Sequence, residues 1–550
     1  MNGKNKLRRF VSRLRPIGNK KTAAAVLAPI LAILALSAWA LASPVGASPD
    51  DDYHLASAWC ATNVDTEQCG LVPEKSERSV PNSLLASPCY AFKSTESASC
   101  QGAMFEDTNN FVTSDRGNFS GAYPPVYYSV MHLLAGSNIE VSAMLMRVLN
   151  ILIFVGLTGV LYAILPVSRR PTLVWAWAIS LVPLGMFLIA SNNPSSWAII
   201  SAGTIWISLL GFLETTGARK IGLGLVATIA TIVGAGARAD AAAYAVVAVV
   251  VVLLLTARWD RKWILSTLLP LGLAALAAAF YLSTSQSTLV SSGLHSASDA
   301  AAGPGLKSLL INNLLNVPSL WAGVFGTWGL GWLDTTLPAV VWVAGLGCFG
   351  ALAFSGLISE SVRKLLAVTV VLAAVWIIPT YILLKSETFV GSEVQPRYIL
   401  PLIVMLGGIA ILHVGGTQLA LSRGQIIALV SALSVSNALS LHFNMRRYLT
   451  GTDALGLNLD TNREWWWDIP ILPMTVWIVG SVAFVALLLI LAPSITRPRT
   501  VQSKRKEPGV RSDGDVDSAQ PRVECEGAAH GAPPVPVRPQ AEVVAGRALG

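Results

Sequence analysis

The chain has 550 residues, of which 53% are hydrophobic and only 13% are charged, with a formal net charge of +8. Soluble domains carry roughly 25% charged residues, so this chain has too few to cover several globular domains in water. The basic residues lie in short clusters between apolar runs and not in one patch. This pattern excludes an ordinary soluble enzyme, disfavours a nucleic-acid partner, and is typical of a protein that crosses a membrane many times.

The first apolar segment runs from about Thr22 to Ala42 and follows a basic tail at 1–21. A spanning helix needs about 20 mostly apolar residues, so this segment is long enough to be a retained anchor. The triplet Ala40-Leu41-Ala42 also has the form of a signal-peptide cleavage site. We favour the anchor because the apolar stretch exceeds the usual signal core. In both cases the positive-inside rule places the tail in the cytoplasm.

Eleven further apolar runs follow, centred near residues 152, 181, 206, 229, 249, 273, 347, 375, 406, 433 and 482. We therefore expect an all-α polytopic membrane protein with about 12 transmembrane helices over residues 22–493, in which 222–257 could instead be a re-entrant pair. Alternation of sides places the basic clusters and both termini in the cytoplasm. Residues 494–550 are rich in Pro, Gly and charge, which predicts a disordered cytoplasmic tail.

The longest loop, 44–138, is expected outside the membrane, and it carries eleven acidic but only four basic residues. It also holds four of the six cysteines, and an even number in an outside loop indicates two disulfides in an oxidising compartment. A zinc site is the alternative, but the spacings match no standard zinc finger. The most local of the three pairings joins Cys60 to Cys69 and Cys89 to Cys100.

An acidic group, Asp50-Asp51-Asp52-Tyr53-His54, begins this loop directly after the first span. Adjacent carboxylates repel one another and raise one another's pKa unless a cation is present. The group is either the solvated start of a loop or a catalytic cluster in which Asp50 or Asp51 takes a proton from an acceptor hydroxyl beside the imidazole of His54. Asp50 and Asp51 are also candidates for binding a divalent metal such as Mg, Mn or Ca.

Three arginines lie where the membrane does not explain them. Arg397, followed by Tyr398, sits where an outside loop re-enters the membrane, and it either snorkels to the interface or clamps a phosphate with two hydrogen bonds. Arg147 lies inside the second span, where charges are rare and usually paired or functional. Arg238 interrupts the 222–257 stretch, where it forms either a structural pair with Asp240 or part of the phosphate site.

Further polar and aromatic residues lie at the outer ends of the expected spans. Trp and Tyr at this depth are most often residues of the membrane interface, but aromatic faces also stack on sugars. No Walker loop, dinucleotide fingerprint or HExxH motif occurs, so ATP-driven transport and zincin chemistry lack support. The candidates for lining a substrate site are Tyr127, Asn193, Trp332, Asp334, Gln395 and Trp466.

The pattern Pro49-Asp50-Asp51-x-x-His54 resembles the start of a bacterial integral-membrane family, domain of unknown function 2142. The resemblance covers roughly residues 25–490. Two positions depart from the family's pattern, because Asp51 stands where Glu is usual and Arg238 where Lys is common. The other matching motifs follow in order: Tyr123-Pro124-Pro125 with Tyr127-Tyr128, Arg147 with Asn150, Asn193-Pro194, Gly331-Trp332-Leu333-Asp334, and Gln395-x-Arg397-Tyr398.

That family is similar to the GT-C group of membrane glycosyltransferases, which use polyprenyl-phosphate sugars. The resemblance implies that Asp50 or Asp51 is the catalytic carboxylate, that Arg397 holds the lipid phosphate, and that the active face lies outside the bacterial cytoplasmic membrane. The implied partners are the bilayer, the sugar donor and an envelope glycan or lipid acceptor. A transporter or flippase of lipid-linked sugars is the main alternative. It predicts inverted repeats and charges at mid-membrane, whereas no clear repeat is seen. A non-enzymatic envelope protein is a third reading.

Overall fold

The computed structural model describes residues 19–496, apart from 63, 74–75, 108, 286–304, 359–360, 393 and 415–418. The described residues belong to one unit, which extends to Pro498. The basic tail predicted at 1–21, the disordered tail predicted at 494–550 and Cys525 lie almost wholly outside the described residues.

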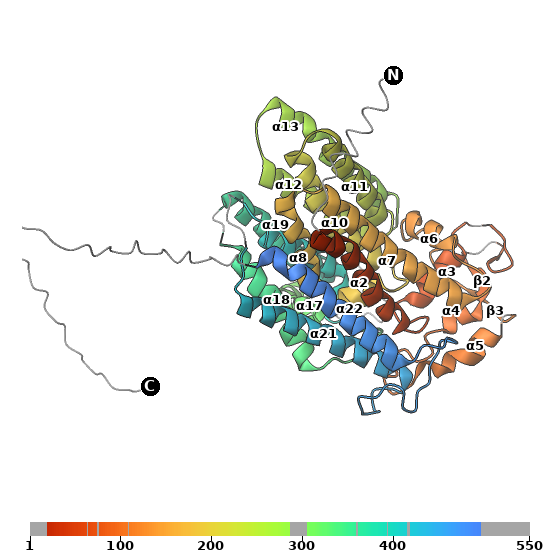
Figure 1. Ribbon diagram of the computed structural model, residues 1–550. Helices are drawn as coiled ribbons and strands as arrows, with labels where there is room; N and C mark the ends of the chain where they lie inside the picture. Colours follow the sequence, from red (N-terminus) through yellow and green to blue (C-terminus); the bar gives the residue numbers. More distant parts are fainter. Residues whose placement is uncertain are drawn as a thin grey trace, which may run out of the picture. The chain divides into compact units, whose positions relative to one another are not determined.

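Within the described residues, ten helices are long and apolar enough to span a membrane. The most buried is α10, which packs against α11, α12 and α20. The helix α2 at the start of the chain packs against α22 at its end (Figure 1). The ten are α2 (Asn19–Leu41), α7 (Ile139–Ile164), α10 (Ser195–Glu214), α11 (Gly217–Ala235), α12 (Ala239–Thr256), α13 with α14 (Arg261–Ser266 and Leu268–Leu282), α18 (Ala339–Gly356), α19 (Val362–Lys385), α21 (Arg423–Leu449) and α22 with η3 (Pro473–Leu491 and Ala492–Ile495).

Two of the expected spans are shorter than the sequence predicts. The run near 181 forms α8 (Arg170–Ser180) and α9 (Leu184–Ile189), separated by a break at Pro183, and η2 (Val167–Arg169) precedes them. The run near 406 forms the 15-residue α20 (Pro396–Ala410), which is buried everywhere except at Tyr398. A helix enclosed by other helices contacts protein and not lipid, so it need not cross the full hydrocarbon thickness. The part of the chain that the structure describes thus has ten long helices plus these shorter segments, which does not confirm the expected count of about 12 spans. The stretch 222–257 forms two separate long helices, α11 and α12.

The segment 44–138 forms a small mixed region beside one end of the helices (Figure 1). Its three strands pair antiparallel in the order β1-β2-β3, with Ser79 opposite Gly70 and Thr113. Farther along the chain, α17 packs against α20. The elements of the segment are α3 (Asp51–Trp59), β1 (Gly70–Leu71), β2 (Arg78–Pro81), α4 (Asn82–Ala86), η1 (Ala98–Gln101), α5 (Gly102–Glu106), β3 (Phe111–Ser114) and α6 (Pro125–His132). Two further short helices, α16 (Leu306–Asn316) and α17 (Pro318–Val324), precede α18.

Two disulfides join the cysteines of this segment. The structure pairs Cys60 with Cys69 and Cys89 with Cys100, which confirms the prediction of two disulfides and has the most local connectivity. Cys348 in α18 is buried and has a free thiol.

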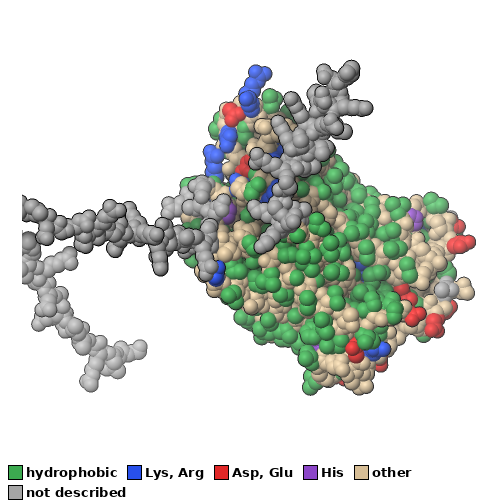
Figure 2. All heavy atoms as spheres, in the orientation of Figure 1, with side chains coloured by type: hydrophobic (Ala, Val, Ile, Leu, Met, Phe, Trp, Pro, Cys, Tyr) green, Lys and Arg blue, Asp and Glu red, His purple; other side chains and the backbone are tan. Residues whose placement is uncertain are grey.

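Charges separate along the molecule. Figure 2 shows hydrophobic side chains over the sides of the helices, Lys and Arg mainly at the end near α13, and Asp and Glu mainly at the end that holds α5 and β3. The positive-inside rule predicts this distribution when 44–138 lies outside. The chain is thus a multi-pass membrane protein, and the side on which each end lies stays a prediction.

We predict that the two disulfides stabilise segment 44–138 without holding the helices together. Each closes a short loop, with sequence separations of 9 and 11 residues. Losing such a crosslink costs about 2–3 kcal/mol. Adding reductant to the purified protein should therefore speed proteolytic cleavage within 44–138 and leave the spanning helices uncut. A Cys348→Ser variant should respond as the wild type does, and equal cleavage rates with and without reductant would contradict the prediction.

Candidate functional site

The chain leaves α2 through an irregular turn, 42–50, that is almost completely buried. A buried backbone carbonyl without a hydrogen bond costs free energy comparable to a lost hydrogen bond. Backbone N–H groups reach only three carbonyls of this turn, those of Pro44, Ser48 and Asp50. Side chains from distant parts of the chain supply the other donors.

The first half of the turn, with the last residues of α2, is held by three side chains. They come from α7, from α21 and from the loop that follows α21. The guanidinium of Arg147 is fully buried and donates to three carbonyls at once. The donors and acceptors are Arg147 with Ala40, Ser43 and Pro44, Asn444 with Ala42, and Trp467 with Leu41.

The second half is held by side chains from 44–138, from the corner before α10, from the loop before α18, and from α21. The carbonyl of Ser48 instead accepts from the backbone N–H of Asp51. Every carbonyl from Ala40 to Pro49 thereby has a donor. The pairs are Tyr90 and Gln101 with Val45, Trp332 with Gly46, Tyr448 with Ala47, and Asn193 with Pro49.

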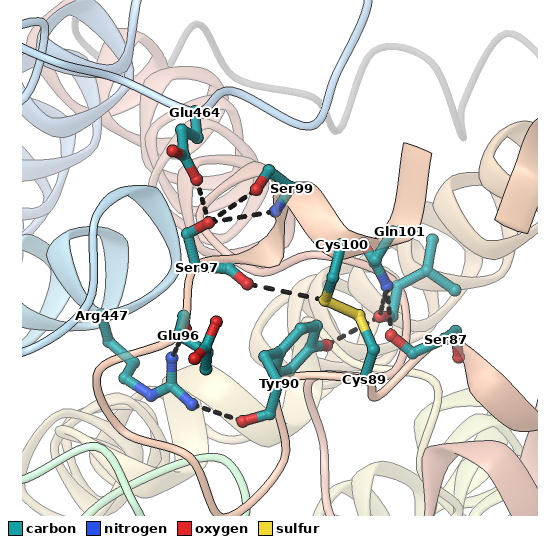
Figure 3. The surroundings of a disulfide bond; sticks show 11 residues. Ser87, Cys89, Tyr90, Glu96, Ser97, Ser99, Cys100, Gln101, Arg447 and Glu464 are labelled. Atoms are coloured by element: carbon teal, nitrogen blue, oxygen red, sulfur yellow. Dashed lines mark hydrogen bonds between the residues drawn. A yellow bond between two sulfur atoms is a disulfide. The ribbon is translucent and has the colours of Figure 1, made fainter. Parts of the chain in front are cut away.

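The disulfide Cys89–Cys100 contributes to this arrangement. Cys89 precedes Tyr90 and Cys100 precedes Gln101, so the crosslink joins the neighbours of the two residues that donate to Val45 (Figure 3). The disulfide therefore keeps both donors in place against the turn.

The turn ends at Asp50, whose backbone lies in the left-handed region with φ 59° and ψ 23°. Residues other than Gly adopt this conformation at a cost, and Asp tolerates it better than most. The side chain is 41% exposed, and its Oδ2 accepts a hydrogen bond from Nη2 of Arg397 at 2.6 Å. Its Oδ1 lies 3.5 Å from Nη2 of Arg116. Asp50 is thus a half-exposed carboxylate between two guanidiniums.

Arg397 is the second residue of α20, and its side chain is only 5% exposed. Its Nη2 donates to Asp50 and to Oη of Tyr398, at 3.0 Å, whereas Nε and Nη1 have no hydrogen-bond partner. Buried donors without partners are uncommon because they cost free energy. Arg397 also lines a small cavity whose other walls are mainly apolar, with Leu184, Phe187, Leu188, Gly323, Leu330, Leu333, Gln395 and Pro396 among them. A buried cation with unused donors beside an apolar cavity suits an amphiphilic anion.

Arg238 lies near Arg397 and is already paired. Its Nε and Nη2 donate to the two oxygens of Asp240 at 2.9 and 2.8 Å. The ring of Tyr398 contacts both guanidiniums, at 4.9 Å from Cζ of Arg238 and 5.0 Å from Cζ of Arg397. Arg238 therefore adds positive charge to the site, while the edge formed by its Nε and Nη2 is occupied by Asp240.

The three predicted catalytic groups differ in their electrostatics. Burial alone would raise the pKa of Asp50, but the guanidiniums of Arg397 and Arg116 hold that pKa below its usual value. Burial lowers the pKa of His54 to about 3 despite the opposing effect of Asp50, so the imidazole is neutral. Its Nδ1 is hydrogen-bonded to Oη of Tyr128 at 2.9 Å, away from solvent.

Asp51 is fully buried, and burial raises its pKa to about 6 although Arg147 opposes the effect. Ser48 and the backbone of Gly46 lie beside it, but neither carboxylate oxygen accepts a hydrogen bond of ordinary geometry. Its neighbours differ from those of Asp50, which lies beside Arg397 and Arg116. A metal ion bound by Asp50 and Asp51 stays a prediction. Among the described residues, no group of three or more His, Cys, Asp and Glu side chains could hold a metal.

The remaining predicted site residues fall into two groups. Gln395 lines the cavity beside Arg397. The others have structural contacts and are not among the residues that line it. The ring of Tyr127 packs on Trp197, and that of Trp466 packs against Tyr448. The side chains of Asn193 and Trp332 donate to carbonyls of the turn, and Asp334 forms a buried ion pair with Arg447 at 2.8 Å. Arg147, which was predicted to bind phosphate, donates to carbonyls with both Nη atoms.

Sequence reasoning missed Arg116. It follows β3 and pairs with Asp52 as well as lying near Asp50. The available signal was that it is one of only four basic residues in a strongly acidic segment.

We predict that Arg147→Met strongly destabilises the protein. The substitution leaves the buried carbonyls of Ala40 and Ser43 without donors and removes the positive charge beside Asp51. Breaking such a buried charged network costs about 3–5 kcal/mol. Thermal unfolding in detergent measures the effect, and Arg170→Met is the matched control because Arg170 donates to a single carbonyl, that of Ala163. Equal losses in the two variants would contradict the assigned role.

Asp51 should make stability depend on pH. The pKa of Asp51 in the folded protein, about 6, exceeds its ordinary value of 3.8. Between these two pH values the carboxyl group is therefore protonated in the folded protein and ionised in the unfolded chain. Stability therefore falls as the pH rises from about 4 to about 6 and is level above that range. Asp51→Asn should remove this fall of about 3 kcal/mol.

The measurement is thermal unfolding of both proteins at about pH 4.5 and about pH 7.5. Glu106→Gln, which changes an exposed carboxylate of the same loop, is the control and should keep the wild-type slope. A wild-type slope in Asp51→Asn would refute the prediction.

Comparison with known proteins gives one finding about identity. No curated protein matches the chain. The model of a family described as a predicted membrane protein (DUF2142) matches residues 33–406, which is more than half of the chain. The match includes Asp50, Arg238 and Arg397 but ends before Asn444 and Trp467, which hold the turn. The chain belongs to this family of membrane proteins.

Proposed function

We propose that the protein is a membrane glycosyltransferase that moves a sugar from a polyprenyl-phosphate donor to an envelope glycan or lipid on the outer side of the bacterial cytoplasmic membrane. The observation that carries this proposal is the ion pair of half-exposed Asp50 with buried Arg397 beside an apolar cavity. It joins a base, a phosphate-binding group and a surface for a lipid chain in one place.

Arg397 binds the donor phosphate in this proposal. A guanidinium matches phosphate oxygens in geometry and charge, and a buried one binds them more strongly than one in water. The neighbouring Leu184, Phe187 and Leu188 of α9 offer an apolar wall for the first part of the polyprenyl chain. The leaving group is a phosphate, which is stable as an anion, so the reaction needs no strong acid.

Asp50 acts as the general base. The acceptor hydroxyl oxygen attacks the anomeric carbon of the sugar, the bond from that carbon to the phosphate oxygen breaks, and the hydroxyl proton moves to Asp50. The exposure of Asp50 gives an acceptor access to it. Asp51 and His54 are buried, so we assign them to supporting Asp50 and not to touching the substrate.

The position of the charged groups supports an enzyme over a transporter. Asp50, Arg238 and Arg397 lie at or next to the ends of helices. In this proposal those ends lie near the outer face of the membrane and away from the midplane, where a transporter typically binds its substrate. A divalent metal such as Mg, Mn or Ca at Asp50 stays a prediction, and the proposed chemistry does not depend on it.

Substitution of the two central residues tests the proposal. Asp50→Asn should lower the rate of sugar transfer by about 100-fold or more, since it removes the base. Arg397→Gln should raise the KM for the donor because it removes the phosphate contact. The assay uses the purified protein, a panel of polyprenyl-phosphate-linked hexoses and pentoses, and envelope lipids and glycans as acceptors.

The control for this assay is Glu106→Gln, which removes one negative charge from the same loop and should keep wild-type turnover. If the wild type transfers sugar and Asp50→Asn does so at the same rate, Asp50 is not the base.

A further inference from the structure

The way in which Asp50 holds Arg397 has a consequence for anion binding. A guanidinium offers two two-pronged edges, one formed by Nε and Nη2 and the other by Nη1 and Nη2. Nη2 is common to both edges, and it is the nitrogen that Asp50 and Tyr398 occupy. The unpartnered nitrogens, Nε and Nη1, lie on different edges. Nη2 carries two hydrogens, one on each edge, so an incoming anion can form a two-pronged contact with Arg397 only by taking one of them from Asp50 or from Oη of Tyr398. On either edge its negative charge also repels the Asp50 carboxylate.

The surroundings allow Asp50 to give up this contact. Its backbone is held through Asn193, which donates to the carbonyl of Pro49 at 2.8 Å, so only the side chain need move. A second cation, Arg116, already lies 3.5 Å from the other carboxylate oxygen and is itself 43% exposed. Arg397 is only 5% exposed and lines the cavity, so a replacing anion would meet it away from bulk water.

We infer that a phosphate ester with an apolar chain replaces Asp50 on Arg397, so that binding of the lipid phosphate releases the Asp50 carboxylate. The resting ion pair keeps the base blocked until the donor is in place. This inference rests on the proposed function for its catalytic meaning, but the exchange itself is a binding event and can be tested without sugar transfer. No bond is made or broken in the exchange, because only hydrogen-bond partners change.

The exchange predicts an effect opposite to that of an ordinary binding residue. Asp50 competes with the phosphate for Arg397, so removing its charge should strengthen binding of a polyprenyl phosphate. Because the pair is half-exposed, we expect Asp50→Asn and Asp50→Ser to bind about three- to tenfold more tightly than the wild type. Arg397→Gln should bind at least about tenfold more weakly, since the charged partner is lost.

The experiment measures binding of a polyprenyl phosphate without a sugar to the purified full-length protein in detergent. Asp52→Asn is the matched control. Asp52 lies two residues from Asp50 and also carries one negative charge, but its side chain pairs with Arg116 and not with Arg397. It should change the affinity by less than about twofold, since its charge does not occupy Arg397. Thermal unfolding of each variant shows whether it is folded, and the two Asp50 substitutions give two chances of a folded protein.

The outcomes separate the inference from the proposed function. Tighter binding by both Asp50 variants, with Asp52→Asn unchanged, supports the exchange, and it does so even if no sugar donor is ever transferred. Unchanged or weaker binding by folded Asp50 variants overturns the exchange, even if transfer depends on Asp50. Inorganic phosphate is the second probe. If it displaces the polyprenyl phosphate at equal concentration, the apolar chain does not contribute to binding, and the assignment of the ligand as a lipid phosphate is overturned.

Discussion

The structure depends on one constraint, which is that the irregular turn after the first span is buried and each of its carbonyls needs a donor. Buried backbone polar groups must be paired, and a turn without regular structure pairs only a few of its own. Donors arrive from α7, from the corner before α10, from the loop before α18, from α21 and its following loop, and from segment 44–138. The turn thereby joins distant parts of the chain at one point, and that point positions Asp50.

The scarcity of charge explains why the arginines near this turn have such different roles. Arg147 and Arg447 are buried, and their Nη atoms donate to backbone carbonyls. Arg447 also donates to Asp334. Arg238 is paired edge-on with Asp240. Arg397 differs, because one nitrogen carries all its contacts and the other two lack partners beside a cavity. Arg147 and Arg447 each leave only Nε without a partner, so Arg397, with two such nitrogens, has the most to gain from a ligand.

The sequence predicted the helices well and the number of spans less well. Hydropathy is a local property, so each of the twelve apolar runs does form helix. Whether a run faces lipid or is enclosed by neighbours depends on packing, and α20 shows the difference because its apolar residues are buried in protein. Among candidate site residues, motif reasoning did not separate Asn193 and Trp332, which hold carbonyls, from Arg397. A side chain that donates to a ligand and one that donates to a buried carbonyl look the same in sequence.

The sequence by itself determined that this is a multi-pass helical membrane protein with a cysteine-bridged acidic segment after its first span, because apolar length, charge clusters and cysteine number are readable along the chain. Only the tertiary structure decided which charged residues meet. Asp50 and Arg397 are 347 residues apart and come together because the turn and α20 pack at the same place. The free nitrogens of Arg397 likewise depend on which distant side chains come within hydrogen-bonding distance, and no local pattern encodes that.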